Sequence, residues 1–96
     1  MTKSKTKAEI EHLSKIAALG CWACRKIGYV DTPAEIHHVS KGVGKGQRAS
    51  NYEVIPLCPT HHRNGGYGVA IHAGRKAWES VFGEELEMLK EVMAEV

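Results

Sequence analysis

This 96-residue sequence has few aromatic side chains and no long apolar run. No stretch approaches the roughly 20 consecutive apolar residues that a membrane span needs. The lysine-rich start is followed by an amphipathic segment, so it lacks the apolar centre of a secretory signal peptide. These absences argue against a membrane protein or a secreted one, and we expect a soluble protein in the cytoplasm.

Cysteine is scarce, and the chain is too short for two domains. Three cysteines cannot all pair, and a disulfide framework is unusual in a reducing compartment, so they suit metal binding better. A single core fits a chain of 96 residues in which 43% of the side chains are hydrophobic. We therefore expect one domain over residues 1–96, which excludes a two-domain enzyme.

Acidic residues are scarce outside the C-terminal segment. Residues 1–83 contain 12 Lys and Arg against 6 Asp and Glu, a balance of +6, whereas residues 84–96 contain 1 against 5, a balance of −4. The net charge of +2 therefore hides a basic body and an acidic tail. A basic body admits a polyanionic partner such as a nucleic acid.

Apolar spacing, capping residues and turns predict helices around a β-hairpin. Thr6 and Glu9 form a capping box, and Gly20 ends the helix that the box begins. We expect strands over 34–39 and 53–57, joined by a basic, glycine-rich loop over 40–51, and helices over 59–64, 75–82 and 84–96. The predicted buried residues are Ile10, Leu13, Ile16 and Leu19 in the first helix, Ala77, Trp78, Val81 and Phe82 in the helix over 75–82, and Leu86, Leu89, Val92, Met93 and Val96 in the last helix, whose glutamates are expected on the opposite side.

Two short motifs share the spacing of zinc knuckles. Cys21-x-x-Cys24 has its counterpart in Cys58-x-x-His61, and together they offer the four ligands that tetrahedral zinc prefers. A redox pair and inert buried thiols are the alternatives, but no βαβ pattern surrounds the first motif and a redox pair leaves Cys58 unexplained. We expect a structural zinc ion, which would also support the small core.

Four further histidines lie close to these motifs in the sequence. His37 and His38 are adjacent in a predicted strand, so their side chains point to opposite faces, and His62 follows the zinc ligand His61 on a helix. Taken singly, each is more often a surface or core histidine. As a set with His72, they suit the hydrolysis of a phosphodiester, which needs a base for water and a cation for the developing charge.

The residues resemble the HNH (ββα-metal) nuclease superfamily. Ile36-His37-His38-Val39 is similar to its first motif, the run from Asn51 to Cys58 to its middle motif, and Cys58-Pro59-Thr60-His61-His62 to its helix motif. The resemblance covers about residues 21–72. The continuation from Ile71 to Trp78, closing with Phe82-Gly83, is most similar to the phage-encoded RecA-dependent nucleases of the recombination-enhancement type.

The resemblance implies an α+β fold with a small ββα-metal core, a zinc knuckle and flanking terminal helices. It places His38 as the general base and Asn51 as the residue that braces its loop. His37 and His62 take metal-ligand positions for a catalytic divalent ion, Mg²⁺ or Mn²⁺ with Zn²⁺ as the alternative, and His72 is a further candidate. Cys21, Cys24, Cys58 and His61 match the structural zinc ligands.

The sequence departs from the superfamily pattern at two positions. His37 stands where many members have aspartate, which changes the metal preference, and His72 lies ten residues beyond His62, too far for the usual spacing within the helix. The assignment of His72 is therefore the weakest of the set.

Basic residues in and beside the motif predict contacts with DNA phosphates. The candidates are Lys41, Lys45, Arg48, Arg63, Arg75 and Lys76. The resemblance alone implies a RecA filament as a partner, in the cytoplasm of a bacterial or phage-infected host cell. A metal-dependent DNA endonuclease is the function that we expect.

Two other functions compete with a nuclease. A non-catalytic, zinc-stapled DNA-binding module explains the cysteines and the basic body but leaves four histidines without a purpose. A zinc hydrolase of peptides or small molecules would need an H-E-x-x-H motif or a glutamate next to the histidine pairs, and the sequence has neither.

Overall fold

The protein is described by a computed structural model that covers residues 5–40 and 50–96. Its elements, in chain order, are α1 (Lys7–Ala18), α2 (Trp22–Lys26), β1 (Glu35–His38), β2 (Val54–Leu57), the π-helix η1 (Thr60–Asn64), the 3₁₀-helix η2 (Ile71–Ala73), α3 (Arg75–Phe82) and α4 (Glu85–Met93). The two strands form an antiparallel sheet, so the α+β class expected from the sequence is confirmed. Within the described ranges, no helix has the length and apolarity that a membrane crossing requires.

The hairpin places the two histidines of β1 on opposite faces. His37 pairs with Ile55 and His38 with Val54 across the sheet. Successive side chains of a strand alternate between its faces, and His37 is accordingly buried while His38 is partly exposed. All four residues of β2 are buried, so β2 forms the centre of the molecule.

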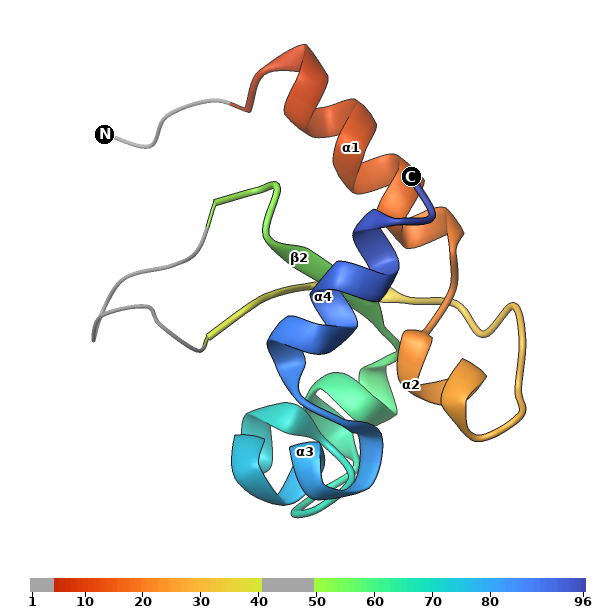
Figure 1. The fold of residues 1–96 in the computed structure, drawn as a ribbon, viewed down its shortest axis with the longest axis vertical. Helices are drawn as coiled ribbons and strands as arrows, with labels where there is room; N and C mark the ends of the chain where they lie inside the picture. The colour runs from red at the N-terminus through yellow and green to blue at the C-terminus, as the bar shows by residue number, and fades with distance from the viewer. Residues whose placement is uncertain (1–4, 41–49) are drawn as a thin grey trace.

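Three helices pack around β2. Figure 1 shows α4 (blue) crossing in front of β2 (green), with α1 and α2 (orange) to one side and α3 at the far end. The sheet strand β2 contacts α1, α2 and α4, whereas α3 contacts η2. Ile16, Ile55 and Trp78 are fully buried between these elements, and Trp22 is nearly so. The prediction that Trp78 is buried is therefore confirmed.

The predicted buried faces are only partly correct. The buried residues of α4 are Glu85, Met88 and Val92, whereas Met93 and Val96 are exposed. Ile10 at the start of α1 and Val81 near the end of α3 are exposed as well. Positions near the ends of short helices extend past the core, so an apolar side chain there is only partly covered.

The start of α1 has the predicted capping box. The backbone N–H of Glu9 donates to Thr6 Oγ1 at 3.1 Å, and the backbone N–H of Thr6 donates to Glu9 Oε1 at 2.9 Å. Two N–H groups that a helix leaves unpaired at its N-terminus are thereby satisfied. The second carboxylate oxygen of Glu9 is left for a contact outside the helix.

Candidate metal centres

The first cysteine knuckle is the N-terminus of α2. Gly20 adopts a φ of 79°, and a Cβ atom there would lie 3.1 Å from the Thr32 carbonyl oxygen, which accepts a hydrogen bond from the Cys21 N–H at 2.9 Å. Cys21 is the N-cap of α2, and its Sγ accepts from the Cys24 N–H at 3.4 Å. The cap places both sulfur atoms on one side of the turn.

The second knuckle joins β2 to η1. Cys58 follows the last residue of β2, and His61 lies in the helix predicted for residues 59–64, which is wound as a π-helix rather than an α-helix. The wide turn is closed by a hydrogen bond of 2.9 Å from Gly65 N–H to Thr60 O. A Cβ atom at Gly65 would lie 2.5 Å from Thr60 O, so this closure requires glycine.

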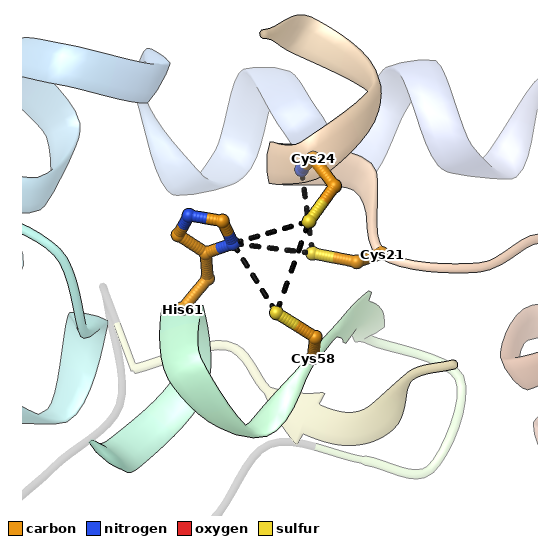
Figure 2. Close-up of side chains that lie close together, drawn as sticks. All are labelled: Cys21, Cys24, Cys58 and His61. Carbon is orange, nitrogen blue, oxygen red and sulfur yellow. Dashed lines mark hydrogen bonds between the residues drawn. The ribbon is translucent and has the colours of Figure 1, made fainter. Parts of the chain in front are cut away.

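Three sulfur atoms and one ring nitrogen converge between the two knuckles (Figure 2). His61 Nδ1 lies 3.6 Å from Cys21 Sγ, 3.4 Å from Cys24 Sγ and 3.3 Å from Cys58 Sγ, and the last two sulfurs are 3.9 Å apart. A tetrahedral zinc ion with Zn–S of ~2.3 Å and Zn–N of ~2.1 Å needs ligand separations of about 3.5–3.8 Å. The four residues therefore fit the zinc site that the sequence predicts.

Burial controls the protonation of this cluster. It raises the pKa of the Cys21 thiol to about 12 and lowers the pKa of His61. A low pKa keeps His61 neutral, the form that binds a metal. A raised thiol pKa means that a cation is required to stabilise the thiolate, so zinc binding would release protons.

A second cluster brings together three histidines from separate elements. His37 of β1, His62 of η1 and His72 of η2 offer ligand nitrogens that all lie within 4.8 Å of one another. Their ring centroids are 4.3 to 5.4 Å apart. Burial, and then the neighbouring rings of His62 and His37, lower the pKa of His72. The structure thus brings His72 beside His62 despite their separation in sequence.

A buried carboxylate holds His37. Glu85 at the start of α4 is fully buried, and its Oε2 lies 2.6 Å from His37 Nε2. Its Oε1 accepts hydrogen bonds from the backbone N–H and the hydroxyl of Ser40, at 2.9 and 3.2 Å. A carboxylate can only accept, so His37 donates from Nε2 and keeps its lone pair at Nδ1.

A second carboxylate holds His62 in the same way. Glu35 Oε1 lies 2.8 Å from His62 Nδ1, which leaves the lone pair of a neutral ring at Nε2. Hydrogen bonds from Arg63, and then from His62, lower the pKa of Glu35 to about 2. Metal-binding histidines commonly donate their other ring N–H to a carboxylate, which orients the ring and fixes its tautomer. Both histidines therefore have the carboxylate contact that is common among metal-binding histidines.

His38 and Asn51 meet on the other face of the hairpin. His38 Nε2 lies 2.8 Å from Asn51 Oδ1, and Asn51 Nδ2 donates to Glu9 Oε2 at 2.9 Å. The base and the asparagine that the resemblance assigns to one site are thus in direct contact. The contact of Asn51 with Glu9 of α1 was not predicted from the sequence.

The predicted DNA-binding residues have different surroundings. Lys41, Lys45 and Arg48 lie outside the described residues. Arg63 is paired with Glu35 at 2.7 Å, and Arg75 with Glu79 at 3.1 Å. Lys76 is exposed in the first turn of α3.

Three glutamates that hold the candidate site residues were not predicted from the sequence. Glu35 lies two residues before His37 on the same strand face, and this spacing was a usable signal. Glu85 has the i, i+3, i+7 spacing of the buried face of α4, so the expectation that the glutamates of this helix lie opposite that face is wrong for Glu85. The contact of Glu9 with Asn51 had no signal, because it joins residues that are 42 positions apart.

Comparison with known proteins gives a family match over nearly the whole chain. A family model described as recombination enhancement, RecA-dependent nuclease matches residues 5–96. No curated protein matches the chain. The match agrees with the resemblance noted for residues 71–83 and extends it to both terminal helices, whereas the wider HNH superfamily remains a prediction.

Proposed function

This chain belongs to the recombination-enhancement, RecA-dependent nuclease family, and from that premise we propose that it is a metal-dependent DNA endonuclease of the HNH type. The observation that carries the proposal is the cluster of His37, His62 and His72, which come from three separate elements. His38, the next residue after His37 in β1, is held by an asparagine. We propose a single domain over residues 1–96 that acts in the cytoplasm of a bacterial or phage-infected cell.

His38 is the proposed general base. With Nε2 donating to Asn51, the lone pair of the neutral ring lies at Nδ1, and this nitrogen takes a proton from water. The water oxygen forms a bond to phosphorus, the bond from phosphorus to the leaving oxygen breaks, and that oxygen takes a proton from solvent. Asn51 keeps the ring in the tautomer that this step needs.

His37, His62 and His72 would hold the catalytic divalent ion. Such an ion neutralises the charge that develops on the phosphate and the leaving oxygen. Glu85 and Glu35 orient two of the ligands through their second nitrogens. Three imidazoles and no carboxylate ligand favour Mn²⁺ or Zn²⁺ over Mg²⁺, which prefers oxygen ligands.

Cys21, Cys24, Cys58 and His61 would hold a structural zinc ion. Four protein ligands complete its tetrahedral shell, and a catalytic zinc site would keep one position open. The two knuckles come from α2 and from the junction of β2 with η1, so the ion would join segments that are distant in sequence.

DNA is the proposed substrate, and a RecA filament is the proposed partner because of the family name. Lys76 is exposed and suited to a phosphate contact, and Lys41, Lys45 and Arg48 remain candidates from the sequence. Arg63 and Arg75 would have to share or exchange their carboxylate partners to contact phosphate.

A cleavage assay tests this function. Purified protein with Mn²⁺, Mg²⁺ or Zn²⁺, with and without a RecA filament, should nick DNA, and His38→Ala should lower the rate by about 10²–10⁴-fold with the fold retained. His12→Ala is the matched control, because His12 lies on α1 against Tyr52 and outside both clusters. Full activity of His38→Ala would contradict the assignment of His38 as the general base.

The number of metal ions that the protein binds distinguishes the nuclease from the non-catalytic DNA-binding module. The nuclease needs one tightly held zinc and a second, exchangeable divalent site that is lost in His62→Ala. A single zinc, no exchangeable site and no cleavage would instead support the non-catalytic module.

A further inference from the structure

A line of hydrogen bonds runs from the first turn of α1 to His38. Glu9 Oε2 accepts from Asn51 Nδ2 at 2.9 Å, and Asn51 Oδ1 lies 2.8 Å from His38 Nε2. The three residues come from α1, from the turn before β2 and from β1. They join the N-terminal helix, which lies outside the HNH-like motif, to the proposed base.

The charge of Glu9 determines the direction of every hydrogen bond in this line. An ionised carboxylate can only accept, so the group of Asn51 that faces it must be the amide NH₂. The carbonyl oxygen of Asn51 then faces His38, and because a carbonyl can only accept, His38 must carry its proton at Nε2. The tautomer of His38 thus follows from the carboxylate of Glu9 through two hydrogen bonds of Asn51.

Glu9 is itself held in place. Its Oε1 accepts from the Thr6 N–H at 2.9 Å, and its own N–H donates to Thr6 Oγ1. A negative charge in the first turn of a helix is also stabilised by the helix dipole. The carboxylate of Glu9 is therefore restrained in the orientation in which it accepts the hydrogen bond from Asn51.

We propose that Glu9 is a positioning residue that fixes His38 in the Nε2–H tautomer through Asn51. The inference rests on the proposed function, in which the Nδ1 lone pair of His38 receives the proton of water. Without an acceptor-only group at position 9, Asn51 can rotate by 180° about its side-chain bond and present its NH₂ to His38. The ring then carries its proton at Nδ1 and cannot act as the base there.

The Glu9→Gln variant tests this directly. The introduced side chain has the same shape but both donates and accepts, so it permits either orientation of Asn51. In ¹⁵N spectra of the full chain without DNA at about pH 8, the imidazole signals of His38 should move from the Nε2–H pattern toward a mixture of tautomers. Assayed with DNA, the variant should lose about tenfold in kcat with KM unchanged.

Exchanging the carboxylate and the amide between positions 9 and 51 should restore the original tautomer of His38. In the double variant Glu9→Gln with Asn51→Asp, the acceptor-only group stands next to His38 and the amide can donate to it. The Nε2–H pattern and most of kcat should return. A wild-type tautomer pattern in Glu9→Gln, or no recovery of that pattern in the double variant, would overturn the proposal.

Thr6→Ala is the matched control for the cap. It removes the acceptor for the Glu9 N–H but leaves the carboxylate on Asn51, so it should weaken α1 without moving the His38 signals. A change of tautomer in Thr6→Ala equal to that in Glu9→Gln would contradict a specific role of the carboxylate. A wild-type protein that cuts no DNA would overturn the nuclease function, while the nitrogen spectra would still decide the role of Glu9.

Discussion

At the scale of single residues, the burial of the Glu85 carboxylate requires an explanation. Its residue is 0% exposed, and a charged group in such a place is costly unless it is fully hydrogen-bonded. Ser40 and His37 supply the donors, from the backbone, a hydroxyl and a ring nitrogen. Glu85 N–H in turn donates to Glu79 Oε2 at 2.8 Å. The arrangement is what a metal ligand needs in order to hold one orientation.

We predict that Glu85→Gln weakens the binding of the exchangeable divalent ion by about 10–100-fold. The glutamine side chain keeps the volume but has one acceptor oxygen, which cannot serve both Ser40 and His37. Calorimetric titration with Mn²⁺ on zinc-loaded protein measures the effect without reference to cleavage. Glu84→Gln is the control, because that side chain is exposed one position earlier. Equal Mn²⁺ affinity in the two variants would contradict the role of Glu85.

At the scale of elements, α4 is attached to the cysteine knuckle by a second glutamate. Trp22 Nε1 of α2 donates to Glu91 Oε1 at 3.1 Å, and Lys26 Nζ lies 3.0 Å from the same oxygen. The hydrogen bond from Lys26, and then that from Trp22, lower the pKa of Glu91. The acidic C-terminal helix is therefore joined through Glu91 to the helix whose N-cap and first turn carry the candidate zinc ligands Cys21 and Cys24.

We predict that Glu91→Gln lowers the free energy of unfolding by about 0.5 kcal/mol at pH 7, a small value because the pair is half exposed. Because folding lowers the pKa of Glu91 below its ordinary value of 4.5, its contribution is complete above that pH and is lost as the pH falls through the folded-state pKa. Urea unfolding of zinc-loaded protein at pH 7 and in steps below pH 4.5 measures the difference between variant and wild type.

Glu87→Gln is the control for that measurement. Glu87 lies on the same helix and pairs with Lys90 of α4 itself, at 3.4 Å, so its loss should leave the contact between α4 and α2 intact. A difference from wild type that stays constant as the pH falls, or that Glu87→Gln reproduces, would contradict the role of Glu91.

At the scale of the whole molecule, we expect stability to depend on the four candidate zinc ligands between the knuckles. A chain of 96 residues has a small core, and chains of this size are often supported by a structural metal. The ligands come from α2 and from the junction of β2 and η1, and these segments pack together at the centre of the fold. Without a cation, three buried thiols would remain side by side with one imidazole.

We predict that removal of zinc by a chelator unfolds most of the chain. Metal binding and folding are coupled in such sites, so circular dichroism should show loss of helix and re-added zinc should restore it. Burial raises the pKa of Cys21, so zinc binding must displace a proton and the zinc affinity should fall as the pH is lowered. Cys58→Ser should reproduce the loss, and a melting temperature that is independent of zinc would contradict the prediction.

The charge distribution has a different meaning in three dimensions. The segment 84–96 carries a balance of −4, which suggested a tail separate from the basic body. Glu85 and Glu91 instead bind His37, Lys26 and Trp22 of that body. Part of the acidic charge of the last helix is therefore bound to residues of the basic body and is not a separate acidic tail.

Features that depend on spacing along the chain could be predicted before the fold was known. The Cys-x-x-Cys and Cys-x-x-His motifs indicated the zinc ligands, the strand period placed His37 and His38 on opposite faces, and the capping box located the start of α1. Each of these follows from local backbone geometry, because residues within about four positions have fixed relative directions.

The contacts between distant groups, in contrast, became known from the packing of the elements. His72 joins His37 and His62, Glu85 holds His37, and Glu9 reaches His38 through Asn51. These contacts span up to 48 positions and depend on how α1 and α4 pack against the hairpin and how η2 packs against η1. Local spacing carries no information on such packing, because the relative placement of elements results from the burial of their apolar faces together.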